Sequence, residues 1–248
     1  MGSFLVGAGV IPRRVIPSLR GDLVVSPIVD AVVTRSLVPW DDTAGDGLRS
    51  DHLPRAFFAR DTRVVARELL GQLVVSVSPD GRASGRIVET EAYLGPDDPA
   101  SHAARLRNGR VAAMWGEPGI AYVYRSYGVH AMLNVVAEPR GQVGAILIRA
   151  LEPLEGIALM RARRGVEDPR LLCSGPGKLC QALGIGLDLH GADLVTSDRL
   201  WIAAGERVTD VSTSSRIGIS RGQEHPWRYW VTGNPNVSAH RRGIPLAD

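Results

Sequence analysis

The amino-acid sequence predicts an α+β fold, a single compact domain with a curved, mostly antiparallel sheet, flanking helices and a protruding β-hairpin. The first reason is that strand-like and helix-like segments are mixed without the strand–helix–strand rhythm of a parallel sheet. The second is a pair of β-rich runs joined by a short turn, which predicts the hairpin. The 248 residues, 44% of them apolar and 22% charged, can fill one hydrophobic core.

Residues 1–55 differ from the rest of the chain. Their apolar patches are short and interrupted by prolines, and no run approaches the roughly twenty apolar residues that a membrane span needs. The start also lacks the basic region of a signal peptide. We therefore expect a poorly ordered, dispensable N-terminal extension over residues 1–55 and a domain over residues 56–248. A start codon assigned too far upstream would explain the same pattern.

The domain is expected to open with a helix and a hairpin. Asp61 is a suitable N-cap for a helix with an apolar face, and Gly71 ends that helix. Two strand-like runs follow, over residues 72–76 and 85–93, on either side of a Pro79-Asp80-Gly81 turn.

The remaining elements follow from the same signals. Residues 119–136 consist of two β-rich runs joined near Ser126-Tyr127-Gly128, with Gly128 as the turn residue. The other expected elements are an irregular stretch over 95–116, a buried strand over 144–150, helices over 154–164 and 174–184, and strands over 200–203, 215–219 and 227–232.

The strand over residues 85–93 carries two carboxylates where a buried strand would carry apolar residues. Because side chains alternate along an extended chain, Glu89, Glu91 and Tyr93 lie on one face. The residues between them form a second face with the character of a core. Charged residues are mostly exposed, so a solvated edge strand is the ordinary alternative and stays open at this point.

Three of the five tyrosines lie in one stretch of six residues, 122–127, of the expected hairpin. Tyr122 and Tyr124 share one face of its first strand, where cross-strand aromatic packing is a sufficient explanation for both. Tyr127 falls at the turn, where a side chain buries little, so packing does not explain it.

Taken together, these stretches resemble the alkyladenine (3-methyladenine) DNA glycosylases of the mammalian type. The resemblance runs in the family's order from about Phe58 to about Ser238, and this joint order is far more specific than any single block. The matching blocks are residues 85–98 (GRIVETEAYLGPDD), Ser101-His102, Pro118-Gly119, 122–124 (YVY), Tyr127-Gly128, Leu133-Asn134, 147–156 (LIRALEPLEG), 172–181 (LCSGPGKLCQ) and Arg216-Ile217-Gly218.

The resemblance implies a DNA-repair glycosylase of base excision repair, which flips alkylated or deaminated purines out of duplex DNA and hydrolyses their N-glycosidic bond. It implies that Tyr127 wedges into the duplex through the minor groove. Tyr93 and Tyr124 would hold the extruded base together with His102, and Tyr122 would help to shape the pocket. A lone histidine is more often structural, but its place in the matching blocks favours a site role for His102.

The chemistry that the resemblance implies centres on one carboxylate. Glu91 would take a proton from a water molecule, and Arg149 and the backbone carbonyl of Ile217 would help to hold that water. Glu89 is interpreted as structural. Lysines of the family do not form Schiff bases, so Lys178 is not expected to cleave the strand, and the enzyme should be monofunctional.

In the region that bears on base selection, this chain departs from the pattern of the family. Asn134 is implied to crowd the 2-amino group of guanine. After the histidine, family members commonly carry an aromatic residue and a Gly-Arg-Thr-Pro-Arg-Asn-like run, whereas this chain has Ala104 and the run LRNGRV over 106–111. The departure concerns the rim of the pocket and the local contacts to DNA.

Charge is compatible with the implied partner, double-stranded DNA containing damaged purines. A net charge of +3 and a pI near 9.2 allow an anionic partner without requiring one. The basic cluster of Arg105, Arg107 and Arg110 is most simply a solvated loop, but on a DNA-binding face it would neutralise phosphates.

Cysteine usage points to a reducing compartment. Cys173 and Cys180 are too few for a disulfide framework, and a single pair lacks the other ligands of a zinc site. We expect no metal, no cofactor and no membrane association, and a monomer located in the cytoplasm and associated with the nucleoid through DNA.

Two other functions are compatible with parts of the sequence. One is a non-catalytic nucleic-acid-binding module of the same fold, against which the presence of both Glu91 and Arg149 argues. The other is an O-glycoside hydrolase that uses Glu89 and Glu91 as its carboxylate pair. Two acids on one face of one strand lie on the same side of any substrate, which suits neither the inverting nor the retaining arrangement.

Overall fold

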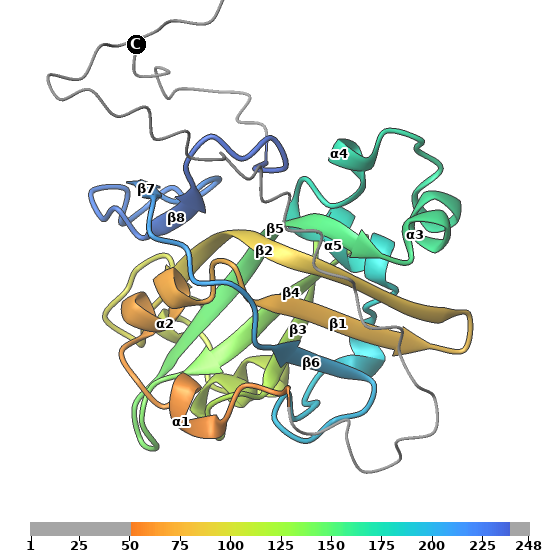
Figure 1. Ribbon diagram of the computed structural model, residues 1–248. Coiled ribbons are helices and arrows are strands. Elements are labelled where there is room, and N and C mark those ends of the chain that lie inside the picture. Colours follow the sequence, from red (N-terminus) through yellow and green to blue (C-terminus); the bar gives the residue numbers. More distant parts are fainter. Residues whose placement is uncertain (1–50, 239–248) are drawn as a thin grey trace, which may run out of the picture. The chain divides into compact units, whose positions relative to one another are not determined.

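The computed structural model describes residues 51–238, which form a single domain around an antiparallel sheet (Figure 1). In this part of the chain the sheet has eight strands, of which six follow the order β3-β4-β5-β2-β1-β6, while β8 joins β2 to β7. Every strand pairing in it is antiparallel. The sheet curls, and the helices pack on it outside any strand–helix–strand alternation, which confirms the predicted α+β class.

The long strand β2 (Gly81–Tyr93) organises the sheet. One of its edges pairs with β5 (Gly144–Glu155) along most of its length. Its other edge is shared: the first half pairs with β1 (Leu73–Ser78), and Glu89 to Glu91 pair with β8 (Arg228–Val231). The second half of β2 therefore has a neighbour on both edges, and one of these neighbours comes from the far end of the domain.

The remaining strands extend the sheet on both sides. They are β3 (Ala121–Ser126), β4 (His130–Ala137), β6 (Leu200–Ala203) and β7 (Val211–Ser214). The helices are α1 (Arg55–Phe58), α2 (Thr62–Glu68), α3 (Ile157–Arg164), α4 (Pro169–Leu172) and α5 (Pro176–Leu183), with 3-10 helices η2 (His102–Ala104), η3 (Gly109–Trp115) and η4 (Leu187–Leu189).

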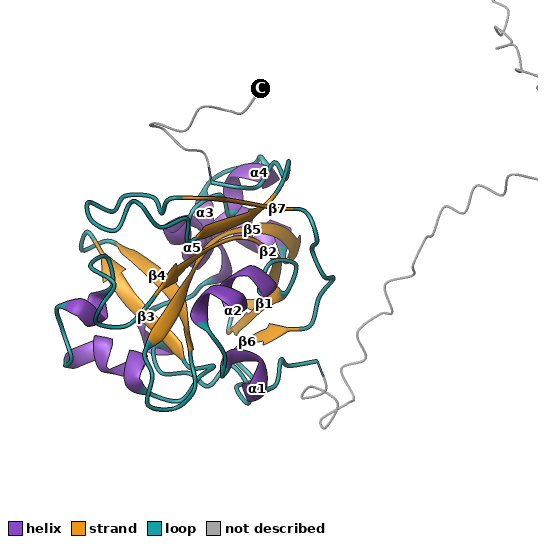
Figure 2. Ribbon diagram, turned by 90° about the vertical axis from the view of Figure 1, so that its left-hand side faces the viewer, coloured by secondary structure: helices purple, strands orange, loops and turns teal. Residues whose placement is uncertain are grey.

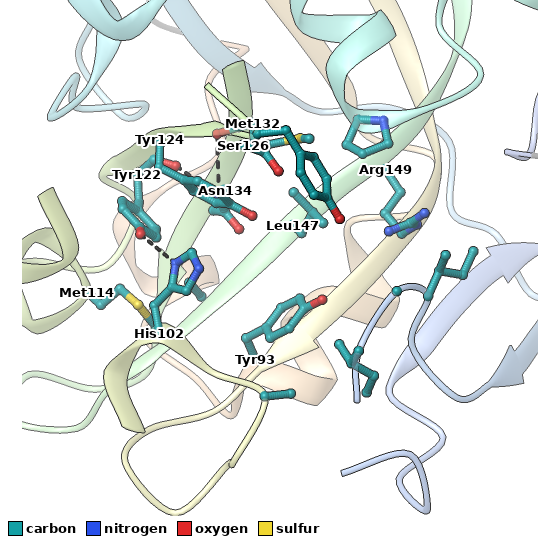
Figure 3. A pocket seen from close by; sticks show the side chains of 17 residues that line it. Tyr93, His102, Met114, Tyr122, Tyr124, Ser126, Met132, Asn134, Leu147 and Arg149 are labelled. Atoms are coloured by element: carbon teal, nitrogen blue, oxygen red, sulfur yellow. Dashed lines mark hydrogen bonds between the residues drawn. The ribbon is translucent and has the colours of Figure 1, made fainter. Parts of the chain in front are cut away.

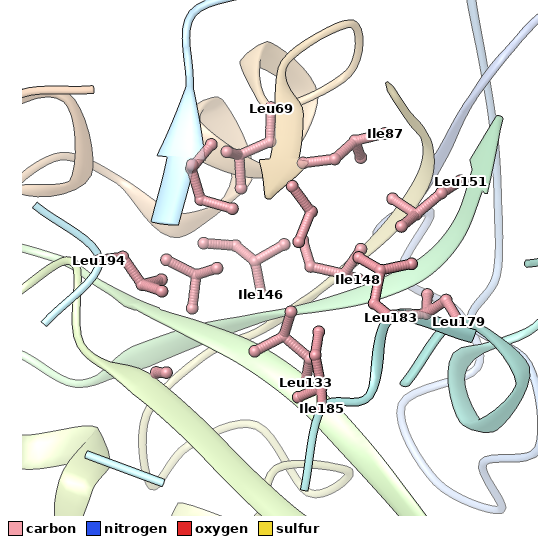
Figure 4. Packing of buried hydrophobic residues seen from close by; sticks show 14 of the residues in the cluster. Leu69, Ile87, Leu133, Ile146, Ile148, Leu151, Leu179, Leu183, Ile185 and Leu194 are labelled. Atoms are coloured by element: carbon pink, nitrogen blue, oxygen red, sulfur yellow. The ribbon is translucent and has the colours of Figure 1, made fainter. Parts of the chain in front are cut away.

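The main core lies between the sheet and the helices α2 and α5 (Figure 4). Fully buried aliphatic side chains from β2, β4 and β5, such as Ile87, Leu133 and Ile148, meet Leu179 and Leu183 of α5 there. Each such side chain contributes about 1.5–3 kcal/mol through burial, so the core fixes the curved sheet against its helices.

The β3–β4 hairpin extends from the curved part of the sheet (Figure 2). Its turn follows the paired residues Ser126 and His130, and both Tyr127 and Gly128 have positive φ, at 49° and 71°. Tyr127 is 92% exposed, so the expectation of a tyrosine at an unburied tip is confirmed.

Several elements differ from their predicted bounds. Residues 215–219 are not a strand, because the strand in this region is β7 and the chain turns inward at Arg216. Strand β5 continues to Glu155, and the next helix begins at Ile157 after Gly156, whose φ of 72° suits a glycine. The irregular stretch over 95–116 contains η2 and η3.

The boundary at residue 55 remains a prediction for the extension, since residues 1–50 lie outside the described part of the chain. Residues just before that boundary contact the domain. The His52 ring stacks on Trp201 at 5.1 Å, and Leu53 is buried. Arg55 donates hydrogen bonds to the Pro118 carbonyl and to Asp193. The folded unit therefore includes residues 52–55.

A comparison of two shortened chains tests this boundary. A chain starting at Asp51 should melt with the full protein, whereas a chain starting at Ala56 loses the burial of Leu53, worth about 2 kcal/mol. At roughly 2–4 °C per kcal/mol for a domain of this size, its melting temperature should fall by about 4–8 °C. Equal melting temperatures, measured by circular dichroism, would show that residues 51–55 add nothing to the fold.

Candidate active site

The register of the sheet brings the candidate residues into one row. Across the sheet, Tyr122 of β3 pairs with Asn134 of β4, Asn134 with Leu147 of β5, and Leu147 with Glu91 of β2. Directly paired residues of antiparallel strands project from the same face. Residues from 91 to 147 therefore point toward one place on the face of the sheet opposite the main core.

Both carboxylates of β2 are fully buried, with 0% exposure for Glu89 and for Glu91. The solvated edge strand is thereby excluded, because β5 and β8 flank this part of β2 on its two edges. Buried charges need charged or hydrogen-bonding partners, and each carboxylate has its own set.

Glu89 is surrounded by donors. Its Oε1 accepts from Nε of Arg149 at 3.1 Å and from Nε of Arg228 at 2.7 Å. Ser238 also donates twice to this carboxylate, from its backbone N–H to Oε2 at 2.8 Å and from Oγ to Oε1 at 2.9 Å. This carboxylate joins β2, β5, β8 and the end of the described chain, which agrees with its interpretation as structural.

Glu91 has a smaller set of partners. Within residues 51–238, its Oε1 accepts from the backbone N–H of Ile217 at 2.7 Å, and its Oε2 accepts from the Tyr93 hydroxyl at 2.8 Å. Nη1 of Arg149 forms an ion pair with Oε2 at 3.2 Å. Ile217 thus contacts Glu91 through its backbone N–H. The predicted role of its carbonyl in holding the water stays a prediction.

Arg149 connects the two carboxylates. Burial alone would lower the pKa of its guanidinium, but the nearby carboxylates of Glu91 and Glu89 raise that pKa by more. Arg149 is therefore a fixed positive charge between two acids, held at the middle of β5.

A pocket of about 350 Å³ opens beside this network, within the usual size range of small-molecule sites (Figure 3). Every predicted base-binding residue, the wedge residue and two of the predicted catalytic residues line it: Tyr93, His102, Tyr122, Tyr124, Tyr127, Asn134, Arg149 and Ile217. Glu91 lies behind three of these, because its partners Tyr93, Arg149 and Ile217 are all lining residues.

One side of the pocket is an aromatic cluster. The rings of Tyr122 and Tyr124 stack with centroids 5.4 Å apart, and the His102 ring meets Tyr124 edge-on at 4.7 Å. His102 Nδ1 and the Tyr122 hydroxyl share a hydrogen bond of 2.8 Å. Figure 3 shows Tyr93 on another side of the pocket from Tyr122 and Tyr124.

These aromatic groups are held in their neutral forms. Burial, and then the charge of Arg105, lowers the pKa of His102 below its usual value. Burial raises the pKa of Tyr124 to about 12, and it raises that of Tyr122 further. Burial and then the charge of Glu91 raise the pKa of Tyr93 well above its usual value. At neutral pH the cluster therefore presents uncharged rings.

Asn134 is fixed in the wall of the pocket. Its Nδ2 donates to the Tyr122 carbonyl at 3.1 Å, and the side chain is almost completely buried. A side chain held in this way acts as a rigid steric limit for any occupant.

Sequence reasoning missed two buried residues of the site. Asp98 and Arg216 stand in the matching blocks but received no role, and the structure joins them in an ion pair next to Tyr93. Their position inside blocks that otherwise consist of site residues was the available signal.

Metal-binding groups are absent from the described part of the chain: residues 51–238 contain no cluster of three or more His, Cys, Asp or Glu side chains that could hold a metal ion. Cys173 and Cys180 are buried and free. Burial raises the pKa of each thiol to about 12, so both are protonated at neutral pH.

Comparison with known proteins identifies the family. A family model described as methylpurine-DNA glycosylase matches residues 56–235, which include every candidate site residue. This chain belongs to the methylpurine-DNA glycosylase family. Membership supports a DNA-repair glycosylase with DNA as its substrate.

Relatives agree with this assignment. A protein of Chlorobaculum parvum is 48% identical over 192 residues, covering 76% of this chain and 91% of the relative. A protein of Rubrobacter xylanophilus is 52% identical over 178 residues, covering 71% of this chain and 92% of the relative. A protein of Salinibacter ruber is 49% identical over 199 residues, covering 75% of this chain and 96% of the relative. All three carry the name "Putative 3-methyladenine DNA glycosylase". They are bacterial proteins, so the comparisons support the family and not the mammalian type.

Between residues 51 and 238, no helix has the length and apolar character to cross a bilayer.

The environment of Glu89 predicts a large effect on stability. Glu89→Gln leaves Arg149 and Arg228 buried without a full counter-charge, and removing one partner of a buried pair costs about 3–5 kcal/mol. Urea unfolding measures this loss. The matched control is Glu68→Gln, which breaks a surface pair with Arg60 and should cost about 1 kcal/mol or less. Similar losses in the two variants would contradict a structural role for Glu89.

Proposed function

We propose that this glycosylase flips alkylated or deaminated purines out of duplex DNA and hydrolyses their N-glycosidic bond with a water activated by Glu91. The observation that carries the proposal is the position of this carboxylate. It is buried, bonded to Arg149, and separated from an aromatic pocket only by residues that line that pocket.

Flipping has a cost that the hairpin tip can offset. Rotating a nucleotide out of the duplex loses a few kcal/mol of stacking and pairing. Tyr127 is 92% exposed at the tip of the β3–β4 hairpin and also lines the pocket entrance. A ring in this place can fill the gap in the stack while the base enters the pocket beside it.

The pocket offers stacking surfaces for the extruded base. Tyr93 stands on one side, and Tyr124 with His102 on another (Figure 3). Each base–aromatic stack is worth about 1–3 kcal/mol. An N3- or N7-alkylated purine is cationic, and neutral, electron-rich rings attract such a base by cation–π interaction, which favours alkylated over normal purines.

The bond changes balance with Glu91 as general base. Water oxygen forms a bond to C1′ of the sugar, and its proton passes to Glu91. The bond from C1′ to the base nitrogen breaks, and its electron pair stays with the base. A cationic alkylated purine then leaves as a neutral molecule, whereas a neutral base such as hypoxanthine or ethenoadenine leaves as an anion that takes a proton from solvent water. A carboxylate has about four acceptor positions, and the partners seen here occupy three, which leaves one on Oε1 for the water.

The chain also supports a monofunctional enzyme. Cleavage of the DNA strand after base removal would use an amine nucleophile at the sugar. The sequence has a single lysine, Lys178, which bonds to Ser174 and is not among the residues that line the pocket. Water is therefore the nucleophile that this pocket can supply.

The alternatives are weaker in light of the geometry. An O-glycoside hydrolase would need a second free carboxylate, and Glu89 is tied to Arg149, Arg228 and Ser238. A non-catalytic binding module would have no need for a carboxylate buried at the wall of the pocket. The exposed residues Arg105, Arg107 and Arg110 near His102 support contacts with DNA phosphates in either case.

The role of Glu91 can be tested by replacing it with an isosteric amide. Glu91→Gln cannot take a proton, so single-turnover base release from duplexes with 3-methyladenine or ethenoadenine should fall by about 10²–10⁴-fold. Affinity for the same duplexes should stay within a few-fold, because stacking and the wedge are intact. The control is Glu68→Gln, which should release base at the parent rate. Near-normal release by Glu91→Gln would remove Glu91 as the base.

The wedge role of Tyr127 predicts that its loss weakens DNA binding and leaves the stability of the protein unchanged. Tyr127→Ser removes an exposed ring, so the melting temperature should change little. Lesion-duplex affinity should fall by roughly 5- to 150-fold, because loss of one stack costs about 1–3 kcal/mol. Tyr122→Phe, which changes a buried ring of the same hairpin, serves as the comparison for stability. Unchanged affinity in Tyr127→Ser would leave the tip without a role in flipping.

A further inference from the structure

Arg216 and Asp98 form an ion pair in which both side chains have 0% exposure. The guanidinium donates to Asp98 through both terminal nitrogens, at 2.5 and 2.8 Å, and also to the Ala92 carbonyl at 2.9 Å. This fork-like geometry fixes the plane of the guanidinium as well as its position. Ala92 belongs to β2, so Arg216 is anchored to the strand that carries Glu91.

The same guanidinium contacts two aromatic rings. Its carbon atom is 4.7 Å from the centre of the Tyr93 ring and 5.0 Å from that of Trp227. Trp227 in turn stacks on His225 at 4.0 Å, with the two rings nearly parallel. The Tyr93 ring is thus in contact with a guanidinium whose position is fixed by Asp98.

Arg216 is also connected to a second neighbour of Glu91 through the backbone. The next residue along the chain is Ile217, whose backbone N–H donates to Glu91. The described partners of Glu91 are the Tyr93 hydroxyl, the Ile217 N–H and Arg149. Arg216 therefore holds two of these three, one through its guanidinium and the other through its backbone.

Asp98 extends this arrangement to the other wall of the pocket. Besides Arg216, its carboxylate accepts from the backbone N–H groups of Leu94 and Ala100. Its carbonyl accepts from the N–H of Ser101, the residue that caps η2 and precedes His102. The loop from Tyr93 to His102 is folded around this one carboxylate.

Stability alone does not account for the pair. Buried ion pairs are often replaced by apolar residues without loss of stability, because desolvation offsets most of the attraction. Here Nε of Arg216 is buried without a hydrogen-bond partner, which adds to the cost. A pair that gives little net stability and orients two partners of Glu91 has another function.

We propose that Arg216, fixed by Asp98, is a positioning residue for base release: it sets the orientation of Glu91 through Tyr93 and Ile217 without touching the base. This inference rests on the proposed function, in which Glu91 activates the water. Small displacements of a reacting group cost up to about 100-fold in rate, so loss of the guanidinium fork should affect the chemical step more than binding.

Arg216→Lys is the direct test, because it keeps the positive charge and removes the planar fork. The matched control is Arg55→Lys, since Arg55 also bonds to one aspartate and one backbone carbonyl, but away from the pocket. Asp98→Asn is the second variant, for use if Arg216→Lys does not fold. Single-turnover base release from an ethenoadenine duplex, affinity for that duplex, and hydrogen exchange of the Ile217 amide are measured for each.

The expected result for Arg216→Lys is a release rate lower by about 10- to 100-fold, with affinity changed by roughly threefold or less. Faster exchange of the Ile217 amide should accompany it, and Arg55→Lys should match the parent in all three measurements. A release rate within threefold of the parent, or an Ile217 amide that exchanges at the parent rate, overturns the inference. Failure of the unaltered protein to release base would instead overturn the proposed function, and the inference with it.

Discussion

The site depends on the burial of charge in the middle of a sheet. Two carboxylates of β2 and two arginines, Arg149 and Arg228, lie together where strands flank β2 on both edges. Charges in such a place are tolerated only when each is paired with near-ideal geometry. The network therefore requires β8 and the chain up to Ser238 to be folded onto β2 before the carboxylates can be enclosed. Assembly of the site therefore depends on the folding of the far end of the domain.

The two acids of β2, Glu89 and Glu91, have different neighbours. Glu89 accepts four hydrogen bonds, from two arginines and from Ser238, whereas Glu91 has three partners and is next to the pocket. The difference arises from what stands opposite each residue, not from the residues themselves. Glu89 and Glu91 share Arg149. Without Glu89, the two buried arginines would exceed the carboxylates by one positive charge, so Glu89 supports the oriented carboxylate of Glu91.

Local patterns in the sequence predicted the elements that carry the site, and long-range contacts decided their details. Alternation along β2 and the tyrosines near Gly128 predicted a shared face and an exposed tip, because period-two geometry is a local property. The burial of both carboxylates was not predictable in this way, since it is produced by β8, which follows in the chain almost 140 residues later. The strand expected over 215–219 is absent for a similar reason: Arg216 turns inward to Asp98, and Gly218 has a φ of 75°. Motif resemblance identified Ile217, but it could not indicate that the N–H of this residue faces Glu91.

The backbone at the hairpin tip links the function of this protein to its stability. Tyr127 has a φ of 49°, in the left-handed region that glycine and asparagine adopt more easily than a tyrosine does. Holding an aromatic residue there costs of order 1–3 kcal/mol. Selection for thermal stability alone would thus favour glycine at this position and would remove the ring that we propose as the wedge. In this enzyme family member, an engineered gain in melting temperature at the tip is therefore expected to come with a loss of lesion recognition.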